Sequence, residues 1–412
     1  MTSPPLRAPY RFPDEPDAVE LRAFTHGLQP ATVPAMMEHF TEDWRRLGVD
    51  AWNDIPNHWR PDSRNAVGWW TLPTYLADEF VAPLLGAPAG TCILQPNVHW
   101  SLQCLLSAPE VHERGPDVLV FDEAFPSLLH SAQQWAELSS LAPTILSSED
   151  SPPDPDIVLD AIDDDTALGA LSHVGFTTGA RLPDATLRRI ADCAAAHDAL
   201  LLLDGYHAAG SMPVDVRDLG CDLYVGGLLK EASGASGNTY LYVRDGLSLT
   251  PRLTGWFGDA APFDFRTSPE PHPDVRRRFL GGTTAVAPMY HAVEGARILL
   301  DVGLDAVRAH SLALTDLAIE RADAADLSVR SPRPPEQRSA MVVLEVPEAE
   351  PLSLHLKDQH IYTDSRRNEV LRMAPFLWNT AEEVHRTFDC IEEALASGTY
   401  RERSPSSPGP VT

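Results

Sequence analysis

Residues 199–207 read ALLLLDGYH, five apolar residues followed by an aspartate, a glycine, a tyrosine and a histidine. A short, unbroken apolar run is typical of a strand that is buried on both faces, as in the centre of a parallel sheet. Open α/β sheets bind their ligands just beyond the carboxyl ends of the strands. We therefore expect Asp204 and His207 to lie at the ligand-binding edge of such a sheet.

Short apolar segments alternate with helical patterns on both sides of this run. The expected elements are strands at residues 118–121, 168–174, 199–204, 222–226 and 239–243, and a helix at 185–197 that Asp184 caps. This alternation predicts an α/β fold in which helices cover both faces of a mostly parallel sheet.

Toward the C-terminus the pattern changes to helices at 291–300, 304–324 and 381–396 and strands at 341–346 and 370–374. This pattern predicts a second, smaller α+β domain. The expected regions are an N-terminal arm and helix at 1–50, a large domain at 51–290, the small domain at 291–398 and a disordered, Ser/Pro-rich tail at 399–412.

Composition limits the classes of partner. The formal net charge of −27 argues against nucleic acid and against anionic membranes, because both require basic patches. The five cysteines are odd in number and form no CxxC pair, so we expect neither a disulfide framework nor a metal site. The chain has no signal-peptide pattern at its start and no apolar run of roughly 20 residues. These features predict a cytoplasmic protein with a small-molecule substrate.

Lysine is nearly absent: of the 32 basic residues, only Lys230 and Lys357 are lysines. Arginine replaces lysine for surface charge, but it does not lose its proton and so cannot act as an amine nucleophile. Lys230 ends the segment VGGLLK, residues 225–230, directly after an apolar strand, whereas Lys357 lies in a polar stretch. Lys230 is therefore a candidate for Schiff-base chemistry. The alternative is a lysine-poor composition that left two lysines by chance.

Asp204 and Lys230 follow neighbouring predicted strands, which places them at the same sheet edge. Pyridoxal phosphate requires this pair, because the lysine forms the internal aldimine and the carboxylate keeps the ring nitrogen protonated. Taken singly, Asp204 is also a plausible helix cap and His207 a plausible partly buried core histidine. Together with Lys230, they favour the cofactor site.

These segments resemble the fold-type I, class V pyridoxal-phosphate enzymes, and most closely kynureninases, over roughly residues 90–395. The resemblance implies a fold-type I transferase architecture: a large domain with a mostly parallel sheet of the seven-stranded type, and a smaller α+β C-terminal domain. It implies pyridoxal 5'-phosphate as cofactor, with Lys230 and Asp204 as catalytic residues and His207 beside the cofactor.

Two further motifs match family segments that bind the cofactor. Asn97 and Val98 fall where the family binds the phosphate, at a helix start that also suits an anion physically. Phe125 and Ser127 match the Phe-Pro-Ser segment, whose ring stacks on the cofactor and whose hydroxyl supports the site.

Three downstream residues match family positions that contact the substrate or the partner subunit. Trp256 and Thr283 match residues that reach the cofactor phosphate of the other subunit, which implies a homodimer with shared active sites. Arg372 matches the arginine that clamps the substrate α-carboxylate, a task that suits its bidentate fork. Read alone, Trp256 could be core, Thr283 a helix cap and Arg372 the partner of a structural acid.

The substrate wall departs from the family pattern. Leu229 stands where kynureninases carry a tyrosine before the Schiff-base lysine, and Tyr206 is the candidate that replaces its phenol. The family's Gly-Asn-Ser-Leu-Gly loop corresponds here to residues 24–30, which lack the Asn-Ser pair. The Trp…Gly-His segment is altered at residues 52–59, where we expect His58 to face the substrate.

Three hypotheses follow. The first is a kynureninase-like hydrolase that cleaves the Cβ–Cγ bond of an L-α-amino acid. The second uses the same site for β-elimination as a C–S lyase, for decarboxylation coupled to oxidative deamination, or for transamination, because side-chain binding decides which bond breaks. The third is a catalytically idle structural or regulatory protein on the same scaffold.

Overall fold

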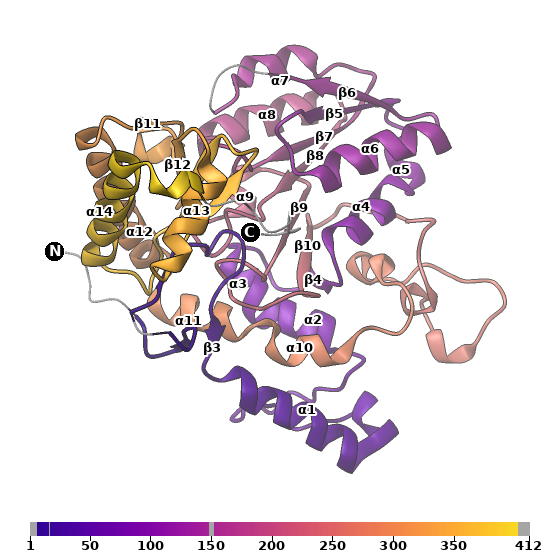
Figure 1. Ribbon diagram of the computed structural model, residues 1–412. Helices are drawn as coiled ribbons and strands as arrows, with labels where there is room; N and C mark the ends of the chain where they lie inside the picture. The colour runs from indigo at the N-terminus through magenta and orange to yellow at the C-terminus, as the bar shows by residue number, and fades with distance from the viewer. Residues whose placement is uncertain (1–5, 16, 148–151, 403–412) are drawn as a thin grey trace.

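The computed structural model describes residues 6–15, 17–147 and 152–402. Its centre is a seven-stranded sheet with the order β4-β10-β9-β8-β7-β5-β6 (Figure 1). The strands are β4 (Cys92–Gln95), β5 (Asp117–Phe121), β6 (Ala142–Leu146), β7 (Thr166–Ser172), β8 (Leu200–Asp204), β9 (Leu223–Gly227) and β10 (Thr239–Val243). Strands β5 to β9 pair in parallel, while β10 runs antiparallel to β9 and β4. The predicted α/β fold with a mostly parallel sheet is confirmed.

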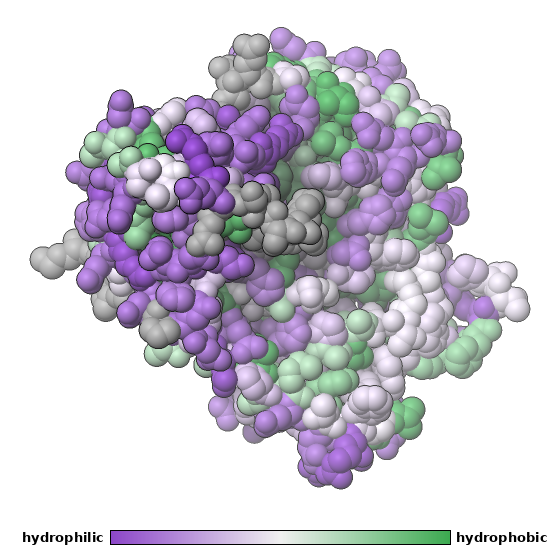
Figure 2. Space-filling model, in the orientation of Figure 1, coloured by the Kyte–Doolittle hydropathy of each residue, from purple (hydrophilic) through white to green (hydrophobic). Residues whose placement is uncertain are grey.

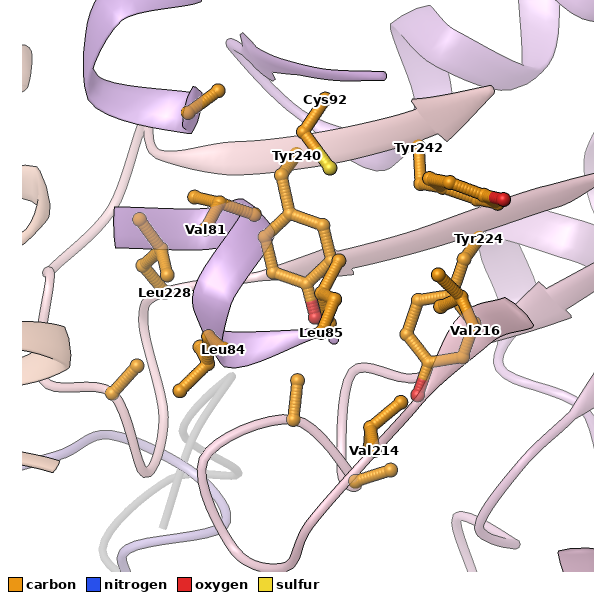
Figure 3. Packing of buried hydrophobic residues seen from close by; sticks show 14 of the residues in the cluster. Val81, Leu84, Leu85, Cys92, Val214, Val216, Tyr224, Leu228, Tyr240 and Tyr242 are labelled. Carbon is orange, nitrogen blue, oxygen red and sulfur yellow. The ribbon is translucent and has the colours of Figure 1, made fainter. Parts of the chain in front are cut away.

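Alternate side chains of the central strands enter two different cores, which explains their unbroken apolar sequence. Leu200 and Leu202 of β8 pack under α4 (Val98–Leu106) and α6 (Pro126–Leu138). Leu201 and Leu203 pack with α8 (Asp184–Ala196) on the opposite face. Figure 3 shows this second core beside Tyr224 of β9 and Tyr240 of β10, against α3 (Ala82–Leu84) and its neighbours.

The sequence did not predict strands β4 and β6. Strand β6 is an edge strand that pairs only with β5, carries Pro143 and is largely exposed, so its sequence lacks the apolar signal of a buried strand. The predicted cap of α8 is also wrong. Pro183 is the N-cap residue, and Asp184 lies inside the first turn, where its carboxylate pairs with Arg181.

The C-terminal region forms a separate four-stranded sheet, β11-β12-β15-β14. Its elements are α12 (Leu304–Ala324), β11 (Ser328–Val329), β12 (Val342–Glu345), α13 (Ala349–Asp358), β13 (Ile361–Tyr362), β14 (Asp364–Arg366), β15 (Val370–Met373) and α14 (Ala381–Ser397). Helices α12, α13 and α14 share one hydrophobic core with this sheet. The exact division of the chain at residues 50, 290 and 398 stays a prediction.

Both ends of the described chain pack against the rest of the protein, whereas the sequence predicts an N-terminal arm and a disordered C-terminal tail. In the N-terminal arm, β2 (Val19–Glu20) pairs in parallel with β13, and β1 (Tyr10–Arg11) pairs with β3 (Gln29–Pro30). The predicted disorder of residues 399–412 is wrong for Thr399–Glu402. These residues form a short helix whose Tyr400 is 1% exposed, because its ring fills the core beside α13 and α14. Residues 403–412 lie outside the described chain.

Three further helices lie beside the large sheet: α1 (Val33–Leu47) packs against α10 (Val286–Ala292), and α11 (Glu294–Val302) follows α10. Within the described ranges, every helix is too short or too polar to cross a bilayer.

Candidate active site

A cavity of about 530 Å³ opens at the carboxyl ends of the central strands, bordered by the small sheet and the N-terminal arm. Its lining residues are Phe24, Thr25, Asn97, Val98, His99, Phe125, Ser127, Ser172, Val174, Phe176, Asp204, Tyr206, His207, Leu229, Lys230, Thr239, Arg366 and Arg372. The structure thus brings together most of the site residues that the sequence predicts. The volume lies in the range of small-molecule sites.

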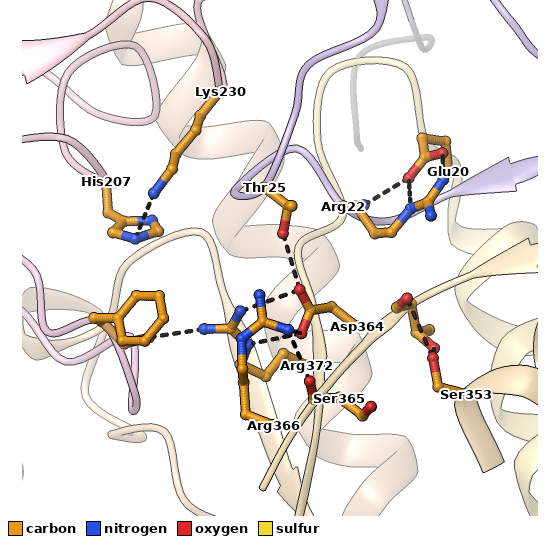
Figure 4. Close-up of polar contacts among 12 residues, drawn as sticks. Glu20, Arg22, Thr25, His207, Lys230, Ser353, Asp364, Ser365, Arg366 and Arg372 are labelled. Atoms are coloured by element: carbon orange, nitrogen blue, oxygen red, sulfur yellow. Dashed lines mark hydrogen bonds and ion pairs between the residues drawn. The ribbon is translucent and has the colours of Figure 1, made fainter. Parts of the chain in front are cut away.

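Lys230 lies at the centre of this cavity, in the turn after β9. Its Nζ is 2.8 Å from Nε2 of His207 (Figure 4). The same Nζ is 4.6 Å from the ring centre of Tyr206. Burial lowers the pKa of Lys230 to about 8, and burial holds the pKa of His207 well below its usual value. The neutral His207 therefore accepts a hydrogen bond from the amine, and more of the Lys230 amine is neutral near pH 7 than for a solvated lysine.

Asp204 ends β8 next to the turn that carries Tyr206 and His207. Its Oδ1 accepts a hydrogen bond from the backbone N–H of Tyr206 at 3.0 Å. Burial raises the pKa of Asp204, so a cation held beside the carboxylate would relieve an unfavourable burial.

The side chains and the backbone of this cavity fit pyridoxal phosphate. Asn97 Oδ1 accepts from the N–H of Trp100 and caps α4, so the start of this helix, with Val98, faces the cavity as an anion site. Phe125 meets Phe176 edge to face at 5.2 Å. The buried Nδ1 of His207 has no partner within the described chain; because Nε2 accepts from Lys230, Nδ1 carries the ring proton and would donate to a bound group.

Arg372 is 1% exposed and held on several sides. Its Nη2 and Nε donate to the two oxygens of Asp364 at 3.1 and 3.3 Å, and its Nη1 donates to the carbonyl of Phe176 at 2.9 Å. Its guanidinium carbon lies 4.7 and 5.0 Å from the ring centres of Phe24 and Phe176. Arg372 pairs with a structural acid, as one reading of the sequence expects, and it lines the cavity with more N–H donors than these bonds use. Its contact with a substrate carboxylate stays a prediction.

Asp364 organises this side of the cavity, and no sequence pattern indicated this role. It accepts from Arg366 Nη1 at 2.6 Å and from Thr25 Oγ1 at 3.0 Å in addition to Arg372 (Figure 4). The acid lies two residues before Arg366 in β14 and pairs in register with Arg372 of β15. Only the pairing of these two strands could have revealed the contact.

Three predicted residues lie outside this cavity. His58 was expected to face the substrate, but its Nε2 bonds Asp43 Oδ2 at 2.8 Å and its ring stacks on His39 in a cluster beside α1. The structure does not support a substrate contact for His58 within one subunit. Thr283 lines a separate pocket with Trp100 and Gly281. Trp256 is 40% exposed on the loop that projects at the right of Figure 1, where exposed hydrophobic residues are visible in Figure 2.

Tyr206 and Leu229 both line the cavity, so the candidate phenol and the residue that lacks one belong to the same site. The ring of Tyr206 lies against Gly227, where an added Cβ would be 2.2 Å from Cζ of the tyrosine. Burial raises the pKa of the Tyr206 hydroxyl, so it stays protonated and able to donate a hydrogen bond at neutral pH.

Known proteins share this fold. A kynureninase of Burkholderia pseudomallei (strain 1106a) is 29% identical over 413 residues, covering 96% of this chain and 93% of its own. The apo cysteine desulfurase of Thermococcus onnurineus NA1 superposes with a TM-score of 0.77 at 19% identity, over 92% of this chain and 95% of its own. A C-DES mutant with glycine covalently linked to its PLP cofactor gives 0.76 at 16% identity, over 92% and 97%.

The family model named Aminotransferase class-V matches residues 104–364, which is more than half of the chain. The match covers Lys230, Asp204 and His207 and the strands that position them. This protein is a fold-type I, pyridoxal-phosphate-dependent enzyme, and it belongs to the aminotransferase class-V family.

Proposed function

We propose that this enzyme is a kynureninase-like hydrolase, which cleaves the Cβ–Cγ bond of an L-α-amino acid that carries a γ-carbonyl group. The observation that supports the proposal is similarity to kynureninase over nearly the whole chain, together with a cavity lined by Lys230, Asp204 and Arg372. An enzyme of the same family with another reaction would need the same cofactor residues, so the reaction must be tested by its product.

The residues of the cavity suit this reaction. Pyridoxal phosphate supplies an electron sink for the pair released when a bond to Cα breaks. Lys230 would hold the cofactor and then take the α-proton through its neutral amine. Asp204 would keep the ring nitrogen protonated, and Arg372 would orient the substrate carboxylate.

The apolar part of the cavity supports a substrate with an aromatic side chain. Phe24 and Phe176 flank the guanidinium of Arg372, and Leu229 adds an aliphatic wall. Rings pack favourably edge to face or offset against such side chains. A carboxylate bound at Arg372 would therefore leave the rest of the molecule among apolar groups.

We also propose a homodimer in which Trp256 and Thr283 complete the partner's site. Support comes from their place outside their own subunit's cavity, together with the exposure of Trp256, Phe263 and Phe265 on one loop. The five free cysteines support a cytoplasmic location.

The test is an assay of purified enzyme with kynurenine and 3-hydroxykynurenine, followed by fluorescence and mass spectrometry of the product. We expect anthranilate or its hydroxylated form together with alanine. Lys230→Ala should abolish the product, while Lys357→Arg, a change of the other lysine, should leave it unchanged. Absence of any anthranilate product would refute the hydrolase.

The second candidate is β-elimination, decarboxylative deamination or transamination at the same site. The specific observation in its favour is Leu229, which lines the cavity without the phenol of the kynureninase pattern. Ammonia, pyruvate and thiol from S-conjugated cysteines would identify elimination. Carbon dioxide or an amino-group acceptor requirement would identify the other two reactions.

A further inference from the structure

Glu231 follows Lys230 directly and is buried, with 2% of its surface exposed. Its Oε2 has no hydrogen-bond partner within the described chain, and it does not line the cavity. The Cβ of Glu231 lies near Gly210: a Cβ added to Gly210 would be 3.5 Å from Cβ of Glu231 and 3.1 Å from Leu299 of α11. A carboxyl group that is buried with one oxygen unpartnered is unfavourable, so its presence beside the reactive lysine calls for a reason.

The electrostatic surroundings link Glu231 to Lys230. Burial raises the pKa of Glu231 and lowers that of Lys230, and the two charges oppose these shifts in each other. Asp204 of β8 also favours the ammonium, while Arg366 of β14 and Arg372 of β15 disfavour it. The neighbouring groups on α10 and α11 are otherwise engaged: His291 bonds the carbonyl of Gly234, and Glu294 pairs with Arg297 and Thr32.

We propose that Glu231 is a positioning residue that sets the charge of the Lys230 amine. Its carboxylate stabilises the Lys230 ammonium near neutral pH, and the amine becomes neutral when the proton passes from Lys230 to the Glu231 carboxylate. The pair then keeps about one proton between two buried groups, which avoids an isolated buried charge in either state. The inference rests on the proposed role of Lys230 as the amine that bonds the cofactor.

The sign of the effect is fixed by charge. An ionised Glu231 stabilises the ammonium and raises the pKa of Lys230, while burial and the two arginines lower it. Removing the carboxylate therefore leaves Asp204, the acceptor nitrogen of His207 and the ring of Tyr206 to favour the ammonium, without the adjacent negative charge. The amine should then lose its proton at lower pH.

The scarcity of lysine permits a direct test on the full-length chain freed of cofactor. Trace acetylation between about pH 5 and about pH 10, read by peptide mass spectrometry, gives a titration curve for Lys230 and, in the same tube, for Lys357. We expect Glu231→Gln to lower the Lys230 midpoint by about one pH unit, which is about fivefold more labelling at pH 7. Glu231→Asp keeps a carboxylate, so its Lys230 midpoint should stay close to that of the unaltered protein. The midpoint of Lys357 should not change in any of these variants.

Two further variants separate electrostatics from packing. Glu231→Met, which is similar in length and has no charge, should reproduce the shift of Glu231→Gln and also serves if the amide variant folds poorly. Glu294→Gln removes another buried carboxylate on α11 and should leave the Lys230 midpoint unchanged. An unchanged Lys230 midpoint in folded Glu231→Gln or Glu231→Met overturns the inference. This labelling involves no substrate, so its outcome is independent of whether the hydrolase assay succeeds.

Discussion

Arg372 is the residue whose replacement tests substrate binding most sharply. We assign the substrate carboxylate to Arg372. Its guanidinium is held by Asp364, by the carbonyl of Phe176, and by the phenyl rings of Phe24 and Phe176. Lys at this position keeps the charge but loses the planar fork. We therefore expect Arg372→Lys to bind the same substrates with a weaker and less oriented contact.

The magnitude follows from the hydrogen bonds that are lost. A hydrogen bond to a charged group contributes about 1.5–3 kcal/mol, and a lysine can replace one bond of a bidentate pair. The loss of the other corresponds to a KM higher by about 10- to 150-fold. The free energy of unfolding should also fall by about 1–3 kcal/mol, because Asp364 loses part of its compensation.

Steady-state kinetics with the substrate identified by product analysis measures KM, and the absorbance of the bound cofactor checks that its site is intact. Arg338→Lys is the matched control, because Arg338 is also 1% exposed and ion-paired, to Asp316, but lies outside the cavity. The control should lose stability without a change in KM. An unchanged KM in Arg372→Lys, with retained cofactor, would refute the assignment of the carboxylate to this residue.

Three other predictions concern the same framework. Asp204→Asn should lower kcat by about 100-fold with cofactor still bound, since an amide does not stabilise a protonated ring nitrogen; an unchanged kcat would contradict this. Gly227→Ala should destabilise the fold by about 1–3 kcal/mol in urea titrations, because the new Cβ would meet Cζ of Tyr206 at 2.2 Å; unaltered stability would show that Tyr206 moves freely. Burial lowers the pKa of His173 to about 3. In the unfolded chain His173 is protonated near pH 6.5, so the free energy of unfolding falls as pH drops below that value, by about 2 kcal/mol at pH 5. His173→Gln should remove this part of the pH dependence. An unchanged slope of the free energy of unfolding against pH would contradict the prediction.

The central sheet could be predicted from the sequence because its strands are buried on both faces. Residues 200–204 and 223–227 contain almost nothing but apolar residues and glycine; the first segment ends at Asp204, and the second ends three residues before Lys230. The edge strand β6 escaped prediction because exposure and Pro143 remove the apolar pattern. Tyr400 was assigned to a tail because one aromatic residue among polar ones gives no periodic signal, although its ring is buried.

The same distinction applies to the site. Lys230, Asp204 and His207 follow neighbouring strands, so sheet topology alone brings them together. Asp364 could not be assigned, because its contacts with Thr25 and Arg372 depend on the packing of the N-terminal arm and on strand register in the small sheet. His58 was misplaced for a related reason: a histidine in an aromatic segment gives no indication of its partner, which proved to be Asp43 of α1.

The most direct test of Lys230 as the cofactor-binding lysine is to trap the bond between protein and cofactor. Borohydride reduction of the holoenzyme, proteolysis and peptide mass spectrometry locate the modified lysine among only two candidates. We expect the mass of reduced cofactor on the peptide that contains Lys230 and none on the peptide that contains Lys357. Cofactor on Lys357, or on neither peptide of a yellow enzyme, would contradict it.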